Sequence, residues 1–145
     1  MPNEDLSAIL DAMRANREQL VAGIQSLTSE DMARARRGGW SVGRVLHHVI
    51  ESEVAYVRLI AHLRGQTAPE VAAVEPADGA AAVEQLRVTR EALVRAADGV
   101  DDDTLYAMSK LGANEYSVLS VLENDGDHDH EHLSQIERLM ATSTP

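Results

Sequence analysis

Apolar residues recur at steps of three and four positions in four separate segments of the chain, and this spacing is typical of amphipathic α-helices. Each apolar stripe stays exposed to water until another helix covers it, so every segment requires a partner. The segments are residues 5–27, 41–64, 79–97 and 117–140. We therefore expect an all-α protein, a four-helix bundle that forms one domain over residues 1–145.

Serine and glycine residues mark the ends of these expected helices. Ser41 and Ser117 each stand directly before an apolar run, as N-cap residues do. Gly65 and Gly99 follow the second and third helices, where glycine commonly ends a helix. Residues 65–78 contain two prolines and no helical period. We expect this segment to be a connector that is long enough to cross the bundle, so it leaves open which helices are neighbours.

The charge of the chain is acidic and unevenly distributed. The sequence holds 24 Asp and Glu against 13 Lys and Arg, which gives a formal net charge of -11. Between Asp98 and Glu137 there are 11 acids and one base, Lys110. A chain with this charge repels phosphate backbones, so we do not expect a nucleic-acid partner. The acids of this segment would also favour cation uptake and oppose anionic substrates.

Three further absences narrow the expected function and location. The chain contains no cysteine, so it cannot supply a disulfide, a thiolate metal ligand or a cysteine nucleophile, and any thiol must come from a small molecule. The first residues lack a basic region followed by an apolar stretch, which is the pattern of a secretory signal. No segment approaches the roughly 18 apolar residues of a membrane-spanning helix. We therefore expect a cytoplasmic protein without a membrane partner.

Five of the six histidines lie in two tight groups, one on the second expected helix and one on the fourth. At about 100° per residue, His128 and His132 fall on adjoining turns of one face of the fourth helix. His48 borders the apolar stripe of the second helix, whereas His47 and His130 point outward. The spacing thus predicts that three imidazoles converge inside the bundle from two helices.

Burying three imidazoles without partners is costly, and a divalent metal ion would satisfy them together. Asp125 and Asp129 lie beside this set, and each could be a fourth ligand or could orient an imidazole through its second ring nitrogen. Asp125, Asp129 and Glu53 are also candidates for moving a proton, but the sequence does not choose among them, so the catalytic residues stay unassigned. A helical segment rich in His, Asp and Glu often just faces solvent. This simpler interpretation is the alternative to a metal site.

Two segments resemble the motifs of a known family. The segment WSVGRVLHH at 40–48 is similar to the W-S-x-x-x-[IVL]-L-x-H helix start of the DinB/YfiT-like proteins, and HDHEHLSQI at 128–136 is similar to their H-x-x-x-H-x-x-Q-[IL] segment. The resemblance implies that His48, His128 and His132 bind a divalent ion, zinc or nickel, with water or substrate in the remaining positions. It also implies that the second and fourth helices are adjacent and that the protein is a homodimer.

Family members with assigned activities include S-transferases and isomerases that use bacillithiol, mycothiol or glutathione. On this resemblance we expect a metal-dependent thiol S-transferase that joins a low-molecular-weight thiol to a small electrophile. Many relatives carry H-E-x-H-H-R-G-Q, whereas this chain has Leu133 and Ser134 in place of the Arg-Gly pair. Two alternatives stay open: a non-catalytic, metal-stabilised homodimeric binding module, and a metal-dependent hydrolase.

Overall fold

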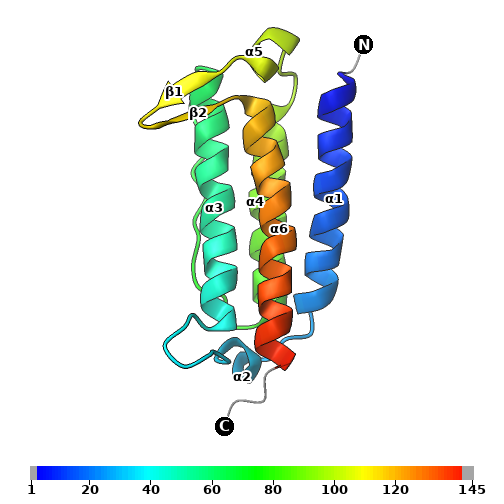
Figure 1. Ribbon diagram of the computed structural model, residues 1–145, viewed down its shortest axis with the longest axis vertical. Coiled ribbons are helices and arrows are strands. Elements are labelled where there is room, and N and C mark those ends of the chain that lie inside the picture. Colours follow the sequence, from blue (N-terminus) through cyan, green and yellow to red (C-terminus); the bar gives the residue numbers. More distant parts are fainter. Residues whose placement is uncertain (1–2, 142–145) are drawn as a thin grey trace.

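The computed structural model describes residues 3–141 and is mostly helical, with four long helices that run along a common axis (Figure 1). In chain order the elements are α1 (Glu4–Ile24), α2 (Ser29–Met32), α3 (Val42–Leu63), α4 (Gly79–Ala97), α5 (Asp102–Tyr106), β1 (Ser109–Leu111), β2 (Asn114–Tyr116) and α6 (Val118–Ala141). The expected all-α bundle is confirmed, with α1, α3, α4 and α6 as its long helices. None of the helices in the described residues is long and apolar enough to cross a membrane.

The ends of the long helices lie within three residues of the expected positions. α3, α4 and α6 agree with the sequence analysis to one residue at each end, whereas α1 ends at Ile24 instead of residue 27. The chain leaves α1 early because Thr28 begins α2: its hydroxyl accepts from Asp31 N, and the Asp31 carboxylate accepts from Thr28 N. Ser41 and Ser117 are N-caps as expected, since their hydroxyls accept from Arg44 N and Ser120 N.

The structure adds a short antiparallel hairpin, β1–β2, that the sequence analysis did not expect. Each strand has three residues, and Lys110 pairs with Glu115 at the centre. Strands this short contain too few positions for an alternating apolar pattern to be recognised. Gly112 lies in the turn with a φ of 64°, a left-handed conformation that glycine adopts without steric cost. The hairpin and α5 close the end of the bundle opposite α2 (Figure 1).

The connector 64–78 runs the length of the bundle and makes α3 and α4 parallel (Figure 1). Gly79 N donates to Leu27 O at 2.9 Å, which holds the start of α4 beside the end of α1. α3 therefore contacts both α4 and α6, and α1 packs mainly against α6. The adjacency of the second and fourth long helices, which the family resemblance implied, is present. It is this adjacency that brings His48 to the histidines of α6.

Close packing of α1 on α6 depends on Gly126. A Cβ atom at this position would lie 3.3 Å from Met13 Cγ, a tight contact that the Met13 side chain would have to relieve by a small shift. Asn16 Nδ2 donates to Gly126 O at 3.1 Å across the same contact. The contact between α1 and α4 is much sparser, and a groove remains between them.

Candidate metal centre

Three histidines meet where α3 lies against α6, and we call them the histidine cluster: His48, His128 and His132. One ring nitrogen of each lies within 4.8 Å of the ligand nitrogens of the other two. The ring centroids are 5.4 Å apart for His48 and His128 and 4.9 Å apart for each of the other two pairs. The structure thus brings together all three histidines that the spacing selected. His130 is exposed, as expected, and His47 is half-buried with Nδ1 3.4 Å from Glu51 Oε1.

The hydrogen bonding of the histidine cluster is incomplete, which fits a metal ligand set. His128 Nδ1 is buried and has no hydrogen-bond partner among the described residues, a costly condition for a polar atom. His132 Nδ1 lies 2.9 Å from Gln135 Oε1. Because an amide oxygen only accepts, Nδ1 carries the proton and Nε2 keeps its lone pair for a ligand. Three imidazoles of this kind match the donor set that zinc and related divalent ions take in proteins.

The pKa values of two histidines in this cluster also favour the binding of a cation. Burial lowers the pKa of His48, and the neighbouring His132 and His128 lower it further. Burial and His132 likewise lower the pKa of His128. Both rings are therefore neutral near pH 7, and the neutral imidazole is the form that binds a metal ion.

Two aromatic rings flank the histidines. The Trp40 ring centroid lies 5.3 Å from that of His48, and the Arg44 guanidinium lies over Trp40 at 5.1 Å. The Tyr56 ring meets His128 nearly edge-on at 5.9 Å. Burial, with a contribution from the charge of Asp125, raises the pKa of Tyr56, so the phenol stays neutral and remains a hydrogen-bond donor. The sequence analysis missed Tyr56, although it lies about two helical turns after His48.

The carboxylates beside the histidines belong to a second set of buried polar side chains, which we call the arginine cluster. Its members come from all four long helices: Arg17, Glu53, Thr89, Arg90, Asp125 and Asp129. Arg17 donates to Glu53 Oε2 and Asp129 Oδ2, each at 2.7 Å. Arg90 donates to Asp125 Oδ2 at 3.0 Å and to Glu53 Oε2 at 3.1 Å.

These contacts bear on the roles considered for Asp125 and Asp129. Every hydrogen bond to the Asp129 carboxylate in the described part of the chain comes from Arg17 or Arg90, at 2.7 to 3.2 Å. Glu53 is fully buried and accepts from the same two arginines and from Thr89. The structure therefore gives these carboxylates arginine partners, and none of them faces an open site where it could exchange a proton with a substrate.

Burial and the neighbouring charges shift the pKa values of two carboxyl groups in the arginine cluster, Asp125 and Glu53, in opposite directions. Three carboxylates against two guanidiniums would leave a buried negative charge, which is unfavourable. Burial raises the pKa of Asp125 well above its usual value, and the nearby charge of Glu53 raises it further. Burial also acts to raise the pKa of Glu53, but the charges of Arg17 and Arg90 outweigh it and lower that pKa. Asp125 is therefore the carboxyl group that we expect to take up a proton first as the pH falls, and a proton there would make the cluster electrically neutral.

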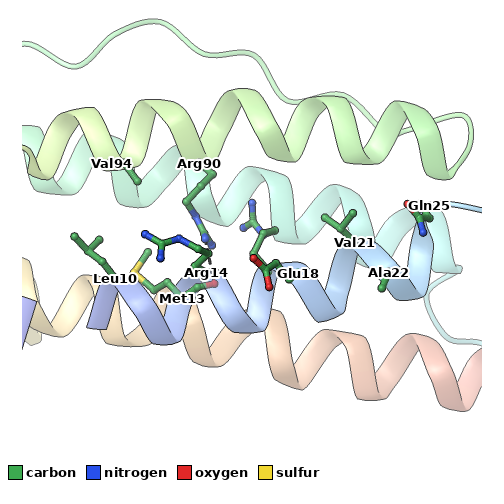
Figure 2. Close-up of a pocket in the computed structure, with 10 residues that line it drawn as sticks. Leu10, Met13, Arg14, Glu18, Val21, Ala22, Gln25, Arg90 and Val94 are labelled. Carbon is green, nitrogen blue, oxygen red and sulfur yellow. Dashed lines mark hydrogen bonds between the residues drawn. The ribbon is translucent and has the colours of Figure 1, made fainter. Parts of the chain in front are cut away.

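Two cavities lie away from the histidines, in the groove between α1 and α4. Two cavities of about 500 and 680 Å³ share Arg17, Val21, Arg90 and Val94 as lining residues. Figure 2 shows apolar side chains of α1, such as Leu10 and Val21, facing the α4 side of this groove. The Arg17 and Arg90 guanidiniums already bind carboxylates. The groove therefore offers an apolar surface with few free polar groups, and the histidine cluster is the better candidate for a reactive site.

Comparisons with known proteins agree with this architecture. Residues 9–136 match the family model of the DinB superfamily. The fold is similar to the crystal structure of a DinB-like protein from Bacillus cereus, with a TM-score of 0.74 and 20% sequence identity over 92% of this chain and 89% of that one. A likeness at this identity concerns the fold. The comparison with curated proteins gives no match.

Proposed function

Because the chain belongs to the DinB superfamily, we propose that its histidine cluster binds one divalent metal ion, zinc or nickel, and that the protein is a metal-dependent thiol S-transferase. The observation that carries the metal site is the convergence of three imidazoles from α3 and α6, with ligand atoms within 4.8 Å of one another. The unpartnered Nδ1 of His128 supports it, because a buried polar atom without a partner is rare.

His48, His128 and His132 would hold the ion, and the ion would supply Lewis-acid chemistry that lowers the pKa of a thiol or water bound to it. Three side chains near the histidines orient, assist or shield this site. Gln135 fixes the tautomer of His132 through Nδ1. Tyr56 stands beside His128 as a neutral phenol that can donate a hydrogen bond to a substrate. Trp40 covers one side of His48 and limits the access of water.

The substrate thiol is external to the protein. The chain has no cysteine, so the sulfur nucleophile must come from a low-molecular-weight thiol such as bacillithiol, mycothiol or glutathione. In the proposed reaction the thiolate sulfur bonds to the electrophilic carbon of a small second substrate, and the leaving group departs with the electron pair of the broken bond. The thiol proton passes to solvent, because the buried carboxylates are held by Arg17 and Arg90.

The test combines metal content with thiol conjugation. Purified protein is loaded with zinc or nickel, the bound ion is counted by elemental analysis, and conjugation of glutathione, cysteine and bacillithiol to 1-chloro-2,4-dinitrobenzene is followed. We expect one ion per chain and a conjugation rate that His48→Ala and His132→Ala abolish. His47→Ala and His130→Ala are matched controls on the same helices and should keep both. Conjugation that survives His48→Ala and His132→Ala would refute the S-transferase.

A non-catalytic, metal-stabilised homodimer is the second candidate, and the α1–α4 groove favours it. This groove is mainly apolar, and Val94 of α4, which lines both of its cavities, is 43% exposed. Light scattering coupled to gel filtration, with and without chelator, measures the oligomeric state. A dimer that dissociates when Val94→Glu is introduced, in a protein without conjugating activity, would favour the binding module. A hydrolase would share the histidine cluster, and ester hydrolysis without any thiol would reveal it.

A further inference from the structure

The groove between α1 and α4 is bordered by a regular stripe of residues from each helix. On α1 the lining residues recur at helical steps of three and four positions from Leu10 to Gln25. On α4 they do so from Val83 to the C-cap residue Asp98. Such a stripe is typical of a helix face that packs against another helix, but contacts between α1 and α4 are sparse. Each helix therefore lines the groove with a face about 22 Å long at the rise of an α-helix.

Two arginines connect the helices across this groove. Arg17 Nη1 of α1 donates to Leu86 O of α4 at 3.0 Å, and Arg90 Nη1 of α4 donates to Met13 O of α1 at 3.2 Å. Both arginines line both cavities of the groove. α1 and α4 are thus joined by long side chains that reach the opposite backbone, without close packing of their aliphatic side chains. This arrangement leaves the space between the two helices open.

The size and lining of the groove match a site for a small molecule. Its two cavities, of about 500 and 680 Å³, fall within the range of roughly 300–1,000 Å³ that is usual for such sites. Leu10 and Val94 line the groove on one side of Glu18, and Val21 and Ala22 line it on the other (Figure 2). No histidine lines either cavity, so this site is separate from the histidine cluster.

The charged groups of the lining indicate which polar end group the groove accepts. Each lining arginine has a carboxylate partner: Arg14 with Asp11, Arg17 with Glu53, Arg87 with Glu84, Arg90 with Asp125 and Arg95 with Glu91. The carboxylates of Glu18 and Asp98, by contrast, have no hydrogen bond or ion pair within residues 3–141. An anionic ligand would have to displace a carboxylate from an arginine, whereas a cation meets Glu18 without a competitor.

We propose that the α1–α4 groove binds an elongated apolar molecule that carries one positively charged amine. The apolar chain lies along the groove, and the amine pairs with the carboxylate of Glu18, which stands near the middle of the α1 stripe. The net charge of -11 also favours a cation over an anion. This binding site goes beyond the proposed function and does not depend on a metal ion.

The test compares three probes of equal chain length and different charge: octylamine, octanol and octanoate. Each is titrated, below the concentration at which it forms micelles, into protein labelled with ¹⁵N, and backbone amide shifts give both the affinity and the place of binding. The titrations are run with chelator and again with zinc, because an amine is also able to bind zinc. A second series of hexylamine, octylamine and decylamine measures the contribution of the apolar chain.

We expect shifts along α1 and α4, and octylamine should bind about fivefold more tightly than octanol, the upper range for an exposed ion pair. Octanoate should bind most weakly. Each added methylene should tighten binding by about fourfold. Glu18→Gln should remove the preference for the amine, while Glu4→Gln, an exposed acid on the same helix that lines neither cavity, should keep it.

A second pair of variants tests the place of binding. Val94→Trp puts a large side chain into both cavities and should weaken all three probes, whereas Val88→Trp, at a similarly exposed position on α4 that lines neither cavity, should not. Equal binding of amine and octanoate, or equal effects of Val94→Trp and Val88→Trp, would overturn the proposal. Amine binding that requires zinc would place the ligand on the metal and also overturn it. A dimer that Val94→Glu dissociates, in a protein that binds no probe, would show that a second copy occupies the groove instead.

Discussion

Two clusters of polar side chains interrupt the aliphatic interior of the bundle, and they differ in how completely their hydrogen-bonding groups are satisfied. In the arginine cluster, guanidinium groups from α1 and α4 bind carboxylates from α3 and α6 at 2.7 to 3.2 Å. In the histidine cluster, three imidazoles from two helices face one another, and His128 Nδ1 has no partner within the described residues.

This difference separates a structural network from a binding site. A buried polar network that is fully satisfied specifies one arrangement of the elements that contribute to it. Arg17, Glu53 and Arg90 each lie in sequence between residues of the two aliphatic cores, so the arginine cluster forms a polar layer that joins all four long helices. The histidine cluster joins only α3 and α6, and it keeps unused ligand capacity. We infer that the arginine cluster holds the four long helices in one arrangement and that the histidine cluster is a site for a ligand.

Removing a guanidinium from the arginine cluster should have the largest effect on stability. Arg17→Met leaves Glu53 and Asp129 buried without their main partner, so we expect the free energy of unfolding to fall by about 3–5 kcal/mol. Urea unfolding followed by circular dichroism measures this change. Arg14→Met, an exposed position on the same helix whose arginine pairs with Asp11, should cost less than about 1 kcal/mol. Similar losses in the two variants would contradict a structural role for the cluster.

Zinc should stabilise the folded protein through the histidine cluster. At a free zinc concentration about 100 times the dissociation constant, the gain is about 2.7 kcal/mol, since the ion binds the folded state. Thermal melting with zinc and then with chelator measures this gain. His48→Ala should abolish it, while His47→Ala should retain it. A melting temperature that zinc leaves unchanged in the unmodified protein would mean that the cluster holds no ion.

Gln135 should tune the affinity for the ion without being a ligand. Gln135→Leu removes the acceptor for His132 Nδ1, and we expect zinc affinity to fall by about 10- to 100-fold. Competition with a fluorescent zinc chelator provides the measurement. Ser134→Ala, at the neighbouring position, is the control and should bind zinc as the unmodified protein does. If the affinities of both variants are unchanged, the tautomer of His132 is not set by Gln135.

The smallest effect concerns the pH dependence of the arginine cluster. The pKa of Asp125 is raised above 3.8 by burial and by Glu53, so its stabilising contribution is present at low pH and is lost as pH rises through the folded-state pKa. The loss is at most about 1.4 kcal/mol per pH unit. Asp125→Asn, which resembles the protonated acid, should remove this dependence. Unfolding free energies between about pH 2 and pH 9 test it.

Glu53 acts with the opposite sign in the same experiment. Its lowered pKa contributes stability that is present above the ordinary value of 4.5 and is lost as pH falls through the folded-state pKa. The acid limb of the profile should therefore persist in Asp125→Asn while the limb at higher pH flattens. A profile with both limbs unchanged would show that the proton is not on Asp125.

Much of the fold and the inward faces of the three histidines could be predicted because both depend on local spacing, whereas the adjacency of their two helices was implied only by the family resemblance. Helical periodicity and N-cap serines act within one or two turns, and they gave the long helices to within three residues. The pair His128 and His132 shares a face for the same reason. The hairpin β1–β2 could not be predicted, since three-residue strands carry no clear alternation.

The partners of the buried acids could not be predicted from the sequence. Burial of Asp125 and Asp129 followed from their place on the helical stripe, but Arg17 is 112 positions from Asp129, and Arg90 is 35 positions from Asp125. No local pattern links residues at such separations. Tyr56 was not assigned to the site for the same reason, because its importance comes from His128 of α6, whose ring lies beside it.

The sequence by itself determined the helices, the faces they bury, the inward histidines and the absence of a protein thiol, since each follows from composition or from a period of one helical turn. The tertiary structure determined which charged side chains form ion pairs. The connector 64–78 permits several helix orders, and only the observed order places Arg17 and Arg90 against the acids of α3 and α6. The same order places His48 of α3 beside His128 and His132 of α6.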